Sequence, residues 1–244
     1  GCDVVLLHAF RPEMLADMDA GVVPDSIAEF ETLADHYGLT SIWMGLHALR
    51  EVRRGAMTMA EWLPDGLHPE ERGSRSYAQC VADALAPALE MASASISAPW
   101  SGDLPRPRDA GCWARVAVAP LTTAACRGPW SMGPWERCPG LTEALHTTAT
   151  GAGLHFDFAG RGLVLGFDFG RESGEVRYRI DGGAWRDTHR DCPAWVGPSG
   201  WLRTETITDD LAPGGHRFEL ETLPADASTG RGTATTLGLI GLML

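Results

Sequence analysis

The chain has 244 residues and a formal net charge of −12, and all 20 of its basic side chains are arginines because it contains no lysine. It contains no asparagine either. These absences exclude a Walker-type phosphate loop, a Schiff-base lysine, N-glycosylation and an asparagine oxyanion donor. With 44% hydrophobic and 21% charged residues, the composition is typical of a globular protein.

The charge pattern also limits the partners and suggests how the chain is divided. The longest run of arginines is Arg53-Arg54, so no basic stripe is present and we expect no nucleic-acid partner. No apolar run approaches the roughly 18 to 20 residues of a membrane span, so we expect none. Acidic residues outnumber arginines by 15 to 6 in residues 1–100 but only by 17 to 14 in the remainder, which favours two domains.

The first part of the chain has an α/β pattern. Residues 4–7 (VVLL) form a continuous apolar run, which predicts a strand buried on both faces. A helix is predicted from Pro24 to a stop at Gly38, and residues 39–44 predict a second strand. Strand, helix and strand at this spacing indicate a βαβ unit with parallel strands. A further amphipathic helix is predicted to begin at Pro69 and to close this domain.

The second part has a β pattern. Residues 93–110 are rich in Ser and Pro and lack periodicity, which indicates a linker. Beyond it, short strands are separated by turns such as 181–183 (DGG) and 212–215 (APGG), both typical of hairpins. An antiparallel sandwich of jelly-roll type is therefore expected. The predicted strands are residues 113–119, 153–159, 162–169, 175–180, 201–206, 216–222 and 233–243.

Residues 61–69 (EWLPDGLHP) contain the most informative pair of side chains. Asp65 lies in a Pro-Asp-Gly turn, and His68 follows three residues later at the start of the predicted helix. The carboxylate can therefore turn back to accept the imidazole Nδ1 proton, which leaves Nε2 free as a general base. A solvated turn histidine is the alternative interpretation of the same spacing. We predict Asp65 and His68 as catalytic residues, with no metal and no organic cofactor.

The context of this pair resembles the SGNH, or GDSL-type, hydrolases, which are esterases and lipases with a flavodoxin-like fold. The resemblance covers residues 3–92 and includes the run 65–73 (DGLHPEERG), which is similar to the family's last sequence block. It implies a fold class of partial flavodoxin-like three-layer α/β domain over residues 1–92, followed by a linker (93–110) and an all-β antiparallel sandwich (111–244). It also implies that His68 is the general base and Asp65 the residue that orients it.

The other half of the family's site is not recognisable. The family's nucleophile lies in a Gly-Asp-Ser motif, and this sequence contains none; 102–104 (GDL) and 197–199 (GPS) do not match it. The family's oxyanion asparagine has no counterpart either. The chain is therefore expected to be an incomplete enzyme. Three explanations stand open, namely a fragment of a longer product, a diverged inactive protein, or a site that another chain completes.

The resemblance implies a serine esterase acting on O-acyl, in particular O-acetyl, esters of carbohydrates. The alternative is a non-catalytic carbohydrate-binding or interaction protein that uses the sandwich, because exposed Trp faces can stack on sugar rings. The compartment and the oligomeric state stay open. Seven of the nine tryptophans fall in the second part: Trp100, Trp113, Trp130, Trp135, Trp185, Trp195 and Trp201.

Overall fold

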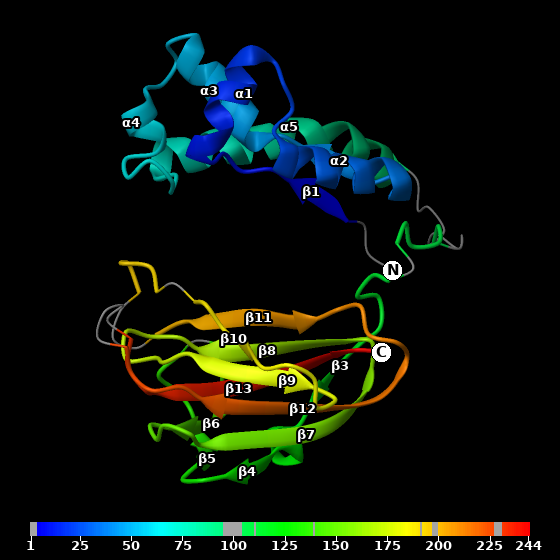
Figure 1. Cartoon of the computed structure of the whole chain (residues 1–244). Helices are drawn as coiled ribbons and strands as arrows, with labels where there is room; N and C mark the ends of the chain where they lie inside the picture. The colour runs from blue at the N-terminus through cyan, green and yellow to red at the C-terminus, as the bar shows by residue number, and fades with distance from the viewer. Residues whose placement is uncertain are drawn as a thin grey trace. The chain divides into compact units, whose positions relative to one another are not determined.

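A computed structural model describes residues 4–94, 104–109, 111–138, 140–190, 192–196, 200–226 and 231–244. The chain divides into two compact units, residues 1–108 and 109–244 (Figure 1). The first is a mixed α/β unit and the second is built from antiparallel sheets. The domain bounds and the linker expected from the sequence stay predictions, and Trp100 lies outside the described residues.

The α/β unit contains the βαβ arrangement that the sequence predicts. Strand β1 (Val5–Leu7) pairs in parallel with β2 (Thr40–Ile42), and helix α2 (Asp25–Tyr37) connects them. Asp25 lies in the first turn of α2, where the helix dipole favours an acidic side chain. Gly38 ends the helix in the left-handed conformation, with φ of 65°, which glycine adopts without a Cβ clash.

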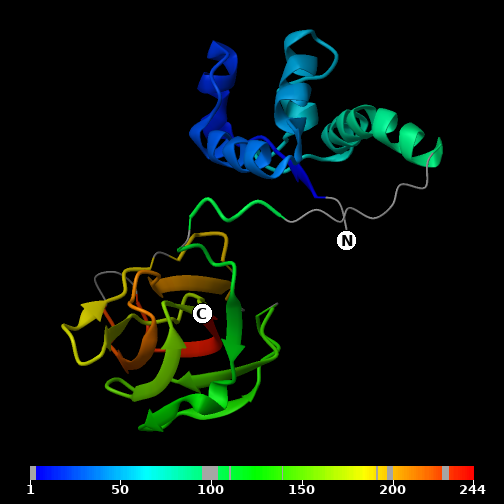
Figure 2. The same cartoon turned by 90° about the vertical axis from the view of Figure 1, so that its right-hand side faces the viewer.

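Five further helical segments complete this unit. Helix α3 packs against α5, α4 also contacts α5, and one apolar core joins the segment after β1 with α2, α3 and α4. Figure 2 shows α2 and α5 on opposite sides of β1, so helices cover both faces of the small sheet. These segments are η1 (Pro12–Met14), α1 (Leu15–Ala20), α3 (Met44–Arg53), α4 (Met59–Trp62) and α5 (Glu71–Ala94).

Two expectations for this unit are wrong in detail. The first strand is not buried on both faces, since Val4 is 52% and Leu7 is 49% exposed. Within the described chain β1 pairs only with β2, and the helices on either side leave Val4 and Leu7 exposed. The last helix begins at Glu71 and not at Pro69, and Leu89 of this helix is exposed.

The second unit is a β-sandwich of two antiparallel sheets. One sheet has the strand order β10-β9-β12-β7-β4, and the other has the order β11-β8-β13-β6-β5 with β3 paired to β13. The strands are β3 (Val116–Ala119), β4 (Ala125–Arg127), β5 (Ser131–Pro134), β6 (Glu143–Thr147), β7 (Gly153–Gly160), β8 (Gly162–Asp168), β9 (Val176–Ile180), β10 (Arg186–Asp187), β11 (Leu202–Thr208), β12 (Gly214–Thr222) and β13 (Thr235–Met243).

Both sheets contribute to one apolar core. Phe156 and Phe218 face it from the first sheet, while Leu165 and Leu237 face it from the second. Alternate residues of each strand point inward because successive side chains of a strand lie on opposite faces. All seven predicted strands are present. Strands β4, β5, β6 and β10 were not predicted; β4 and β10 have only three and two residues.

The two predicted hairpin turns have different outcomes. Residues 181–183 connect the antiparallel neighbours β9 and β10, and both Asp181 and Gly182 have positive φ, as a tight hairpin turn requires. Residues 212–215 do not close a hairpin, because they connect β11 in one sheet with β12 in the other. A Pro-Gly-Gly run specifies a chain reversal but not the strand that the chain next joins.

None of the helices in the described ranges combines the length and the apolar character that crossing a bilayer requires.

Candidate functional site

The segment that carries Asp65 and His68 follows a short capped helix and begins with a hydrogen-bonded turn. Helix α4 begins with a capping box in which Thr58 and Glu61 satisfy each other's main-chain N–H groups. It ends at Trp62, which is fully buried. A tight turn follows, closed by a 2.9 Å hydrogen bond from the Gly66 N–H to the Leu63 carbonyl. Gly66 has φ of 84°, so a residue without a Cβ is favoured there.

Asp65 and His68 are joined by two kinds of hydrogen bond. Oδ2 of Asp65 lies 2.7 Å from Nδ1 of His68, so the ring donates to the carboxylate. Oδ1 accepts the main-chain N–H groups of Leu67 at 2.8 Å and of His68 at 2.7 Å. The carboxylate therefore fixes both the backbone and the ring of His68. This orientation leaves Nε2 as the proton-accepting atom of a neutral imidazole.

These donors act strongly on the carboxylate. The main-chain N–H of His68, its imidazole and the main-chain N–H of Leu67, in that order, hold the pKa of Asp65 well below its usual range. The two residues lie on the surface, and the side chain of His68 is 77% exposed. Asp65 is therefore a permanent anion at neutral pH whose charge is available to stabilise an imidazolium.

Contacts near the strand ends place this turn within the unit. Phe10, three residues beyond β1, packs on Trp62 with ring centroids 4.8 Å apart. The Phe10 N–H also donates to the Tyr77 hydroxyl of α5 at 3.1 Å. The turn with Asp65 and His68 therefore lies on the side of the carboxyl end of β1, where open α/β sheets bind their ligands.

The site as described lacks a nucleophile. Within the described ranges, no serine or cysteine side chain hydrogen-bonds to His68, and no group bonds to its Nε2. The sequence segment 197–199, which contains Ser199, lies outside the described residues. The structure thus brings together the two predicted residues and adds no third member of a triad.

A polar cluster around a second histidine, His8, was not predicted from the sequence. His8 follows β1 directly and is largely buried, and its Nε2 lies 3.1 Å from the Ser41 hydroxyl. That hydroxyl donates to Glu31 of α2, which also accepts the Trp43 indole N–H at 2.5 Å. Because the serine proton is bound to a carboxylate, this cluster ties α2 to both strands and does not activate a nucleophile. Its signal in the sequence is a polar residue directly after an apolar strand.

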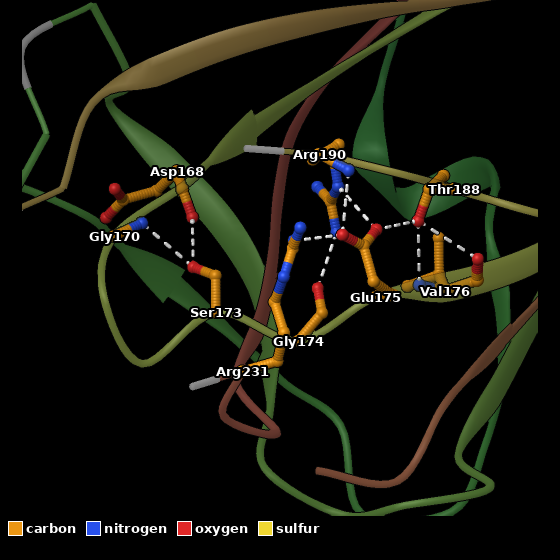
Figure 3. A network of polar contacts seen from close by, with 9 residues as sticks. All are labelled: Asp168, Gly170, Ser173, Gly174, Glu175, Val176, Thr188, Arg190 and Arg231. Atoms are coloured by element: carbon orange, nitrogen blue, oxygen red, sulfur yellow. Dashed lines mark hydrogen bonds and ion pairs between the residues drawn. The ribbon is translucent and has the colours of Figure 1, made fainter. Parts of the chain in front are cut away.

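The sandwich contains a buried ionic network (Figure 3). Arg190 is 1% exposed, and its guanidinium lies 4.6 Å from the ring of Phe167 and 4.4 Å from the ring of Phe169. Glu175 accepts the main-chain N–H of Arg190 at 2.8 Å and its Nε at 3.3 Å, and it also bonds to Arg231. These groups satisfy one another, so a charged network can lie inside the sandwich.

The tryptophans of the sandwich fall into two groups. Trp195 is 73% exposed and Trp185 is 36% exposed, whereas the other described members are half-buried. The ring of Trp185 is covered by the guanidinium groups of Arg177 and Arg179. The ring of Trp195 is stacked on Trp201, with centroids 4.8 Å apart and an interplanar angle of 18°.

Comparisons with known proteins give a structural likeness only. No known family model and no curated protein sequence matches the chain. The structure is similar to that of a two-domain esterase (CEX) active on acetylated mannans, with a TM-score of 0.75, 16% identity and coverage of 98% of this chain and 62% of that one. The structure of this esterase co-crystallised with mannopentaose gives a TM-score of 0.71 at the same identity and coverage.

A third solved structure matches less of the chain. A family two carbohydrate esterase from Cellvibrio japonicus gives a TM-score of 0.38 and 15% identity over 52% of this chain and 32% of that one, too low to support an argument. The two higher scores show that the fold of this chain, an α/β unit followed by a β-sandwich, is shared with the two-domain esterase. The chain spans 62% of the length of that esterase.

Proposed function

We propose that this chain carries the His-Asp pair of an SGNH-type serine-esterase triad, with His68 as the general base and Asp65 as the residue that orients it. The observation that carries the proposal is the 2.7 Å contact from Asp65 Oδ2 to His68 Nδ1, on the side of the carboxyl end of β1. The fold shared with an esterase supports it.

The proposed reaction follows from this geometry. A serine hydroxyl loses its proton to Nε2 of His68 as its oxygen attacks the acyl carbonyl carbon. The imidazolium so formed is stabilised by the Asp65 carboxylate, which stays ionised. It then returns the proton to the leaving alcohol as the ester bond breaks. Water, deprotonated by the same Nε2, releases the acyl group as a carboxylic acid and restores the serine.

The nucleophile and the oxyanion donors of the complete site belong, in this proposal, to a part of the protein outside these 244 residues. Two observations support this step. The sequence has no Gly-Asp-Ser motif and no asparagine. The chain also spans only 62% of the similar esterase. His68 and Asp65 are then one side of a site whose other side is supplied elsewhere.

We propose an O-acetylated carbohydrate as the substrate class. The structural neighbour is described as active on acetylated mannans, which makes acetylated mannan the first substrate to test on this protein. No metal ion or organic cofactor has a part in the proposed reaction, because a Ser-His-Asp triad with an oxyanion hole carries out acyl transfer without either.

The test uses the longer protein that contains this chain. Release of acetate from acetylated mannan and of nitrophenol from p-nitrophenyl acetate is measured for the wild type, for His68→Ala and for His155→Ala. His155 is exposed on β7 and serves as the matched control. We expect a loss of at least about 100-fold in kcat for His68→Ala, the usual contribution of a general base, and no change for the control. Unchanged turnover in His68→Ala would refute the assignment.

The alternative function, a carbohydrate-binding protein without catalysis, is favoured by one observation, the exposed Trp195 stacked on Trp201. It predicts that the longer protein binds glycans but hydrolyses no acetyl ester. A glycan-binding surface on the sandwich is compatible with either function, so only the hydrolysis assay separates the two.

A further inference from the structure

Three loop segments gather at one end of the sandwich. The Trp135 indole N–H, after β5, donates to Asp168 at the end of β8 at 2.6 Å. The Phe169 N–H donates to the Trp201 carbonyl, just before β11, at 2.8 Å. Residues far apart in the sequence are thereby brought to one surface that includes the Trp195–Trp201 stack.

Trp195 is rigidly presented despite its exposure. Its segment is held by Arg171, which donates to the carbonyl of Ala194 and to the carbonyl of Val196, both at 3.2 Å. One face of its ring is stacked on Trp201. A large aromatic side chain left 73% exposed costs solvation free energy, so its fixed position points to a recognition role.

A small polar cavity of about 40 Å³ lies at the same end of the sandwich. Its lining includes Trp135, His146, Asp168 and Gly200. The rings of Trp135 and His146 are stacked 5.0 Å apart. The volume holds a single water-sized polar group, such as a hydroxyl.

Asp168 is the chemically distinctive member of this cavity. The residue is 7% exposed, and its Oδ2 accepts the Trp135 indole N–H. Its Oδ1 is buried and accepts no hydrogen bond from the described residues. The main-chain N–H of Trp201 lies near the carboxylate and lowers the pKa of Asp168. Burial raises the pKa of Asp168. The hydrogen bonds from Trp135 and Cys138 and the charge of Arg137 lower this pKa, but by less than burial raises it.

The loop that follows Asp168 leads into the ionic network (Figure 3). The Gly170 N–H bonds to the Ser173 hydroxyl at 2.8 Å, and that hydroxyl lies 3.4 Å from the Asp168 carbonyl. Two residues further, Glu175 is bound to buried Arg190. The loop that follows Asp168 is therefore fixed, so the carboxylate is presented without an ordering cost on binding.

We propose that this end of the sandwich is a glycan subsite, in which a pyranose ring stacks on Trp195 and a hydroxyl of the same chain of sugars donates to Asp168. Sugar rings present one face of C–H groups, which an indole face fits, and hydroxyls, which a carboxylate accepts. The choice of a carbohydrate as ligand rests on the proposed function. The subsite would hold the carbohydrate part of the ester.

The test is a calorimetric titration of the chain with mannopentaose, with cellopentaose and xylopentaose as further probes. We expect saturable binding of at least one of them by the wild type. Trp195→Ala should weaken it about tenfold and Asp168→Asn should weaken it as well, while Trp185→Ala, the other exposed tryptophan of the sandwich, should leave Kd unchanged. A thermal melt checks that Asp168→Asn stays folded. Because Trp195 is exposed, Trp195→Ala tests the subsite even if Asp168→Asn does not fold.

Three results would overturn the subsite. They are no binding of any probe by the wild type, an unchanged Kd in Trp195→Ala, and an equal loss in Trp185→Ala and Trp195→Ala. These probes carry no ester, so the titration is independent of hydrolysis. A failed titration with His68-dependent esterase activity intact refutes only the subsite, whereas binding without any esterase activity refutes only the proposed reaction.

Discussion

Asp65 binds His68 twice, through the ring Nδ1 at 2.7 Å and through the main-chain N–H at 2.7 Å, using a different carboxylate oxygen for each. The ring orientation and the turn therefore depend on the same side chain. This dependence can be measured separately from the removal of the base itself.

The first prediction concerns Asp65→Asn in the complete esterase that the proposed function calls for. An amide in this position can present its N–H₂ to Nδ1, which favours the tautomer with the proton on Nε2 and removes the base. We expect kcat on p-nitrophenyl acetate to fall by a factor on the order of 10²–10⁴ with a smaller change in KM. A kcat within twofold of the wild type would contradict the orienting role.

The second prediction concerns the turn. Gly66 has φ of 84°, a left-handed conformation that strains a residue with a Cβ. No other atom lies within 4 Å of the position that this Cβ would take. Gly66→Ala should lower the free energy of unfolding of the α/β unit by about 1–2 kcal/mol, and Gly66→Asn should lose less because asparagine tolerates this conformation. Urea denaturation measures both. Equal losses in the two variants would show that the left-handed backbone is not the cause.

The third prediction concerns the contact that positions this turn against the last helix. A Cβ on Gly73 of α5 would lie 2.6 Å from the Trp62 ring and 2.6 Å from its carbonyl oxygen. Gly73→Ala should therefore destabilise the unit by about 1–3 kcal/mol through overpacking, despite the better helix propensity of alanine. The control Arg75→Ala removes only an exposed pair with Glu71 and should cost less than about 0.5 kcal/mol. A stabilising Gly73→Ala would refute the close contact.

The fourth prediction concerns the buried ion pair of the sandwich. Glu175→Gln leaves the guanidinium of Arg190 buried without its carboxylate, which should cost about 3–5 kcal/mol. The matched control is Glu219→Gln, whose partner Arg179 is partly exposed, and it should cost less than about 1 kcal/mol. Chemical denaturation of both variants decides the point. Similar small losses would mean that Arg190 is satisfied without Glu175.

The fifth prediction concerns pH. His216 donates through Nδ1 to Asp181 at 2.7 Å and through Nε2 to the Ala212 carbonyl at 2.8 Å. The Asp181 hydrogen bond, followed by the Ala212 one, raises the pKa of His216. Its stabilisation is complete below the unfolded value of about 6.5 and is lost as pH rises through the folded pKa. The stability of the sandwich should fall over that window, and Asp181→Asn should flatten the curve. A flat wild-type curve would contradict the interaction.

Some features of this protein were predictable from the sequence because they depend on groups close together in the chain. The strand, helix and strand of the α/β unit follow from apolar periodicity and from Gly38. The Asp65–His68 contact spans three residues and needs only a local turn with Gly66. The seven predicted strands of the sandwich also have local patterns. The catalytic role of Asp65 and His68 stays a prediction.

Other features were decided only by the tertiary structure, because they depend on residues far apart in the chain. The assignment of β11 and β12 to different sheets cannot be read from the turn between them. Arg190 looks like a surface residue in the sequence, and its burial depends on Glu175 and two phenylalanine rings brought to it by other strands. Burial is a property of the neighbours that long-range packing supplies, and local sequence does not specify them.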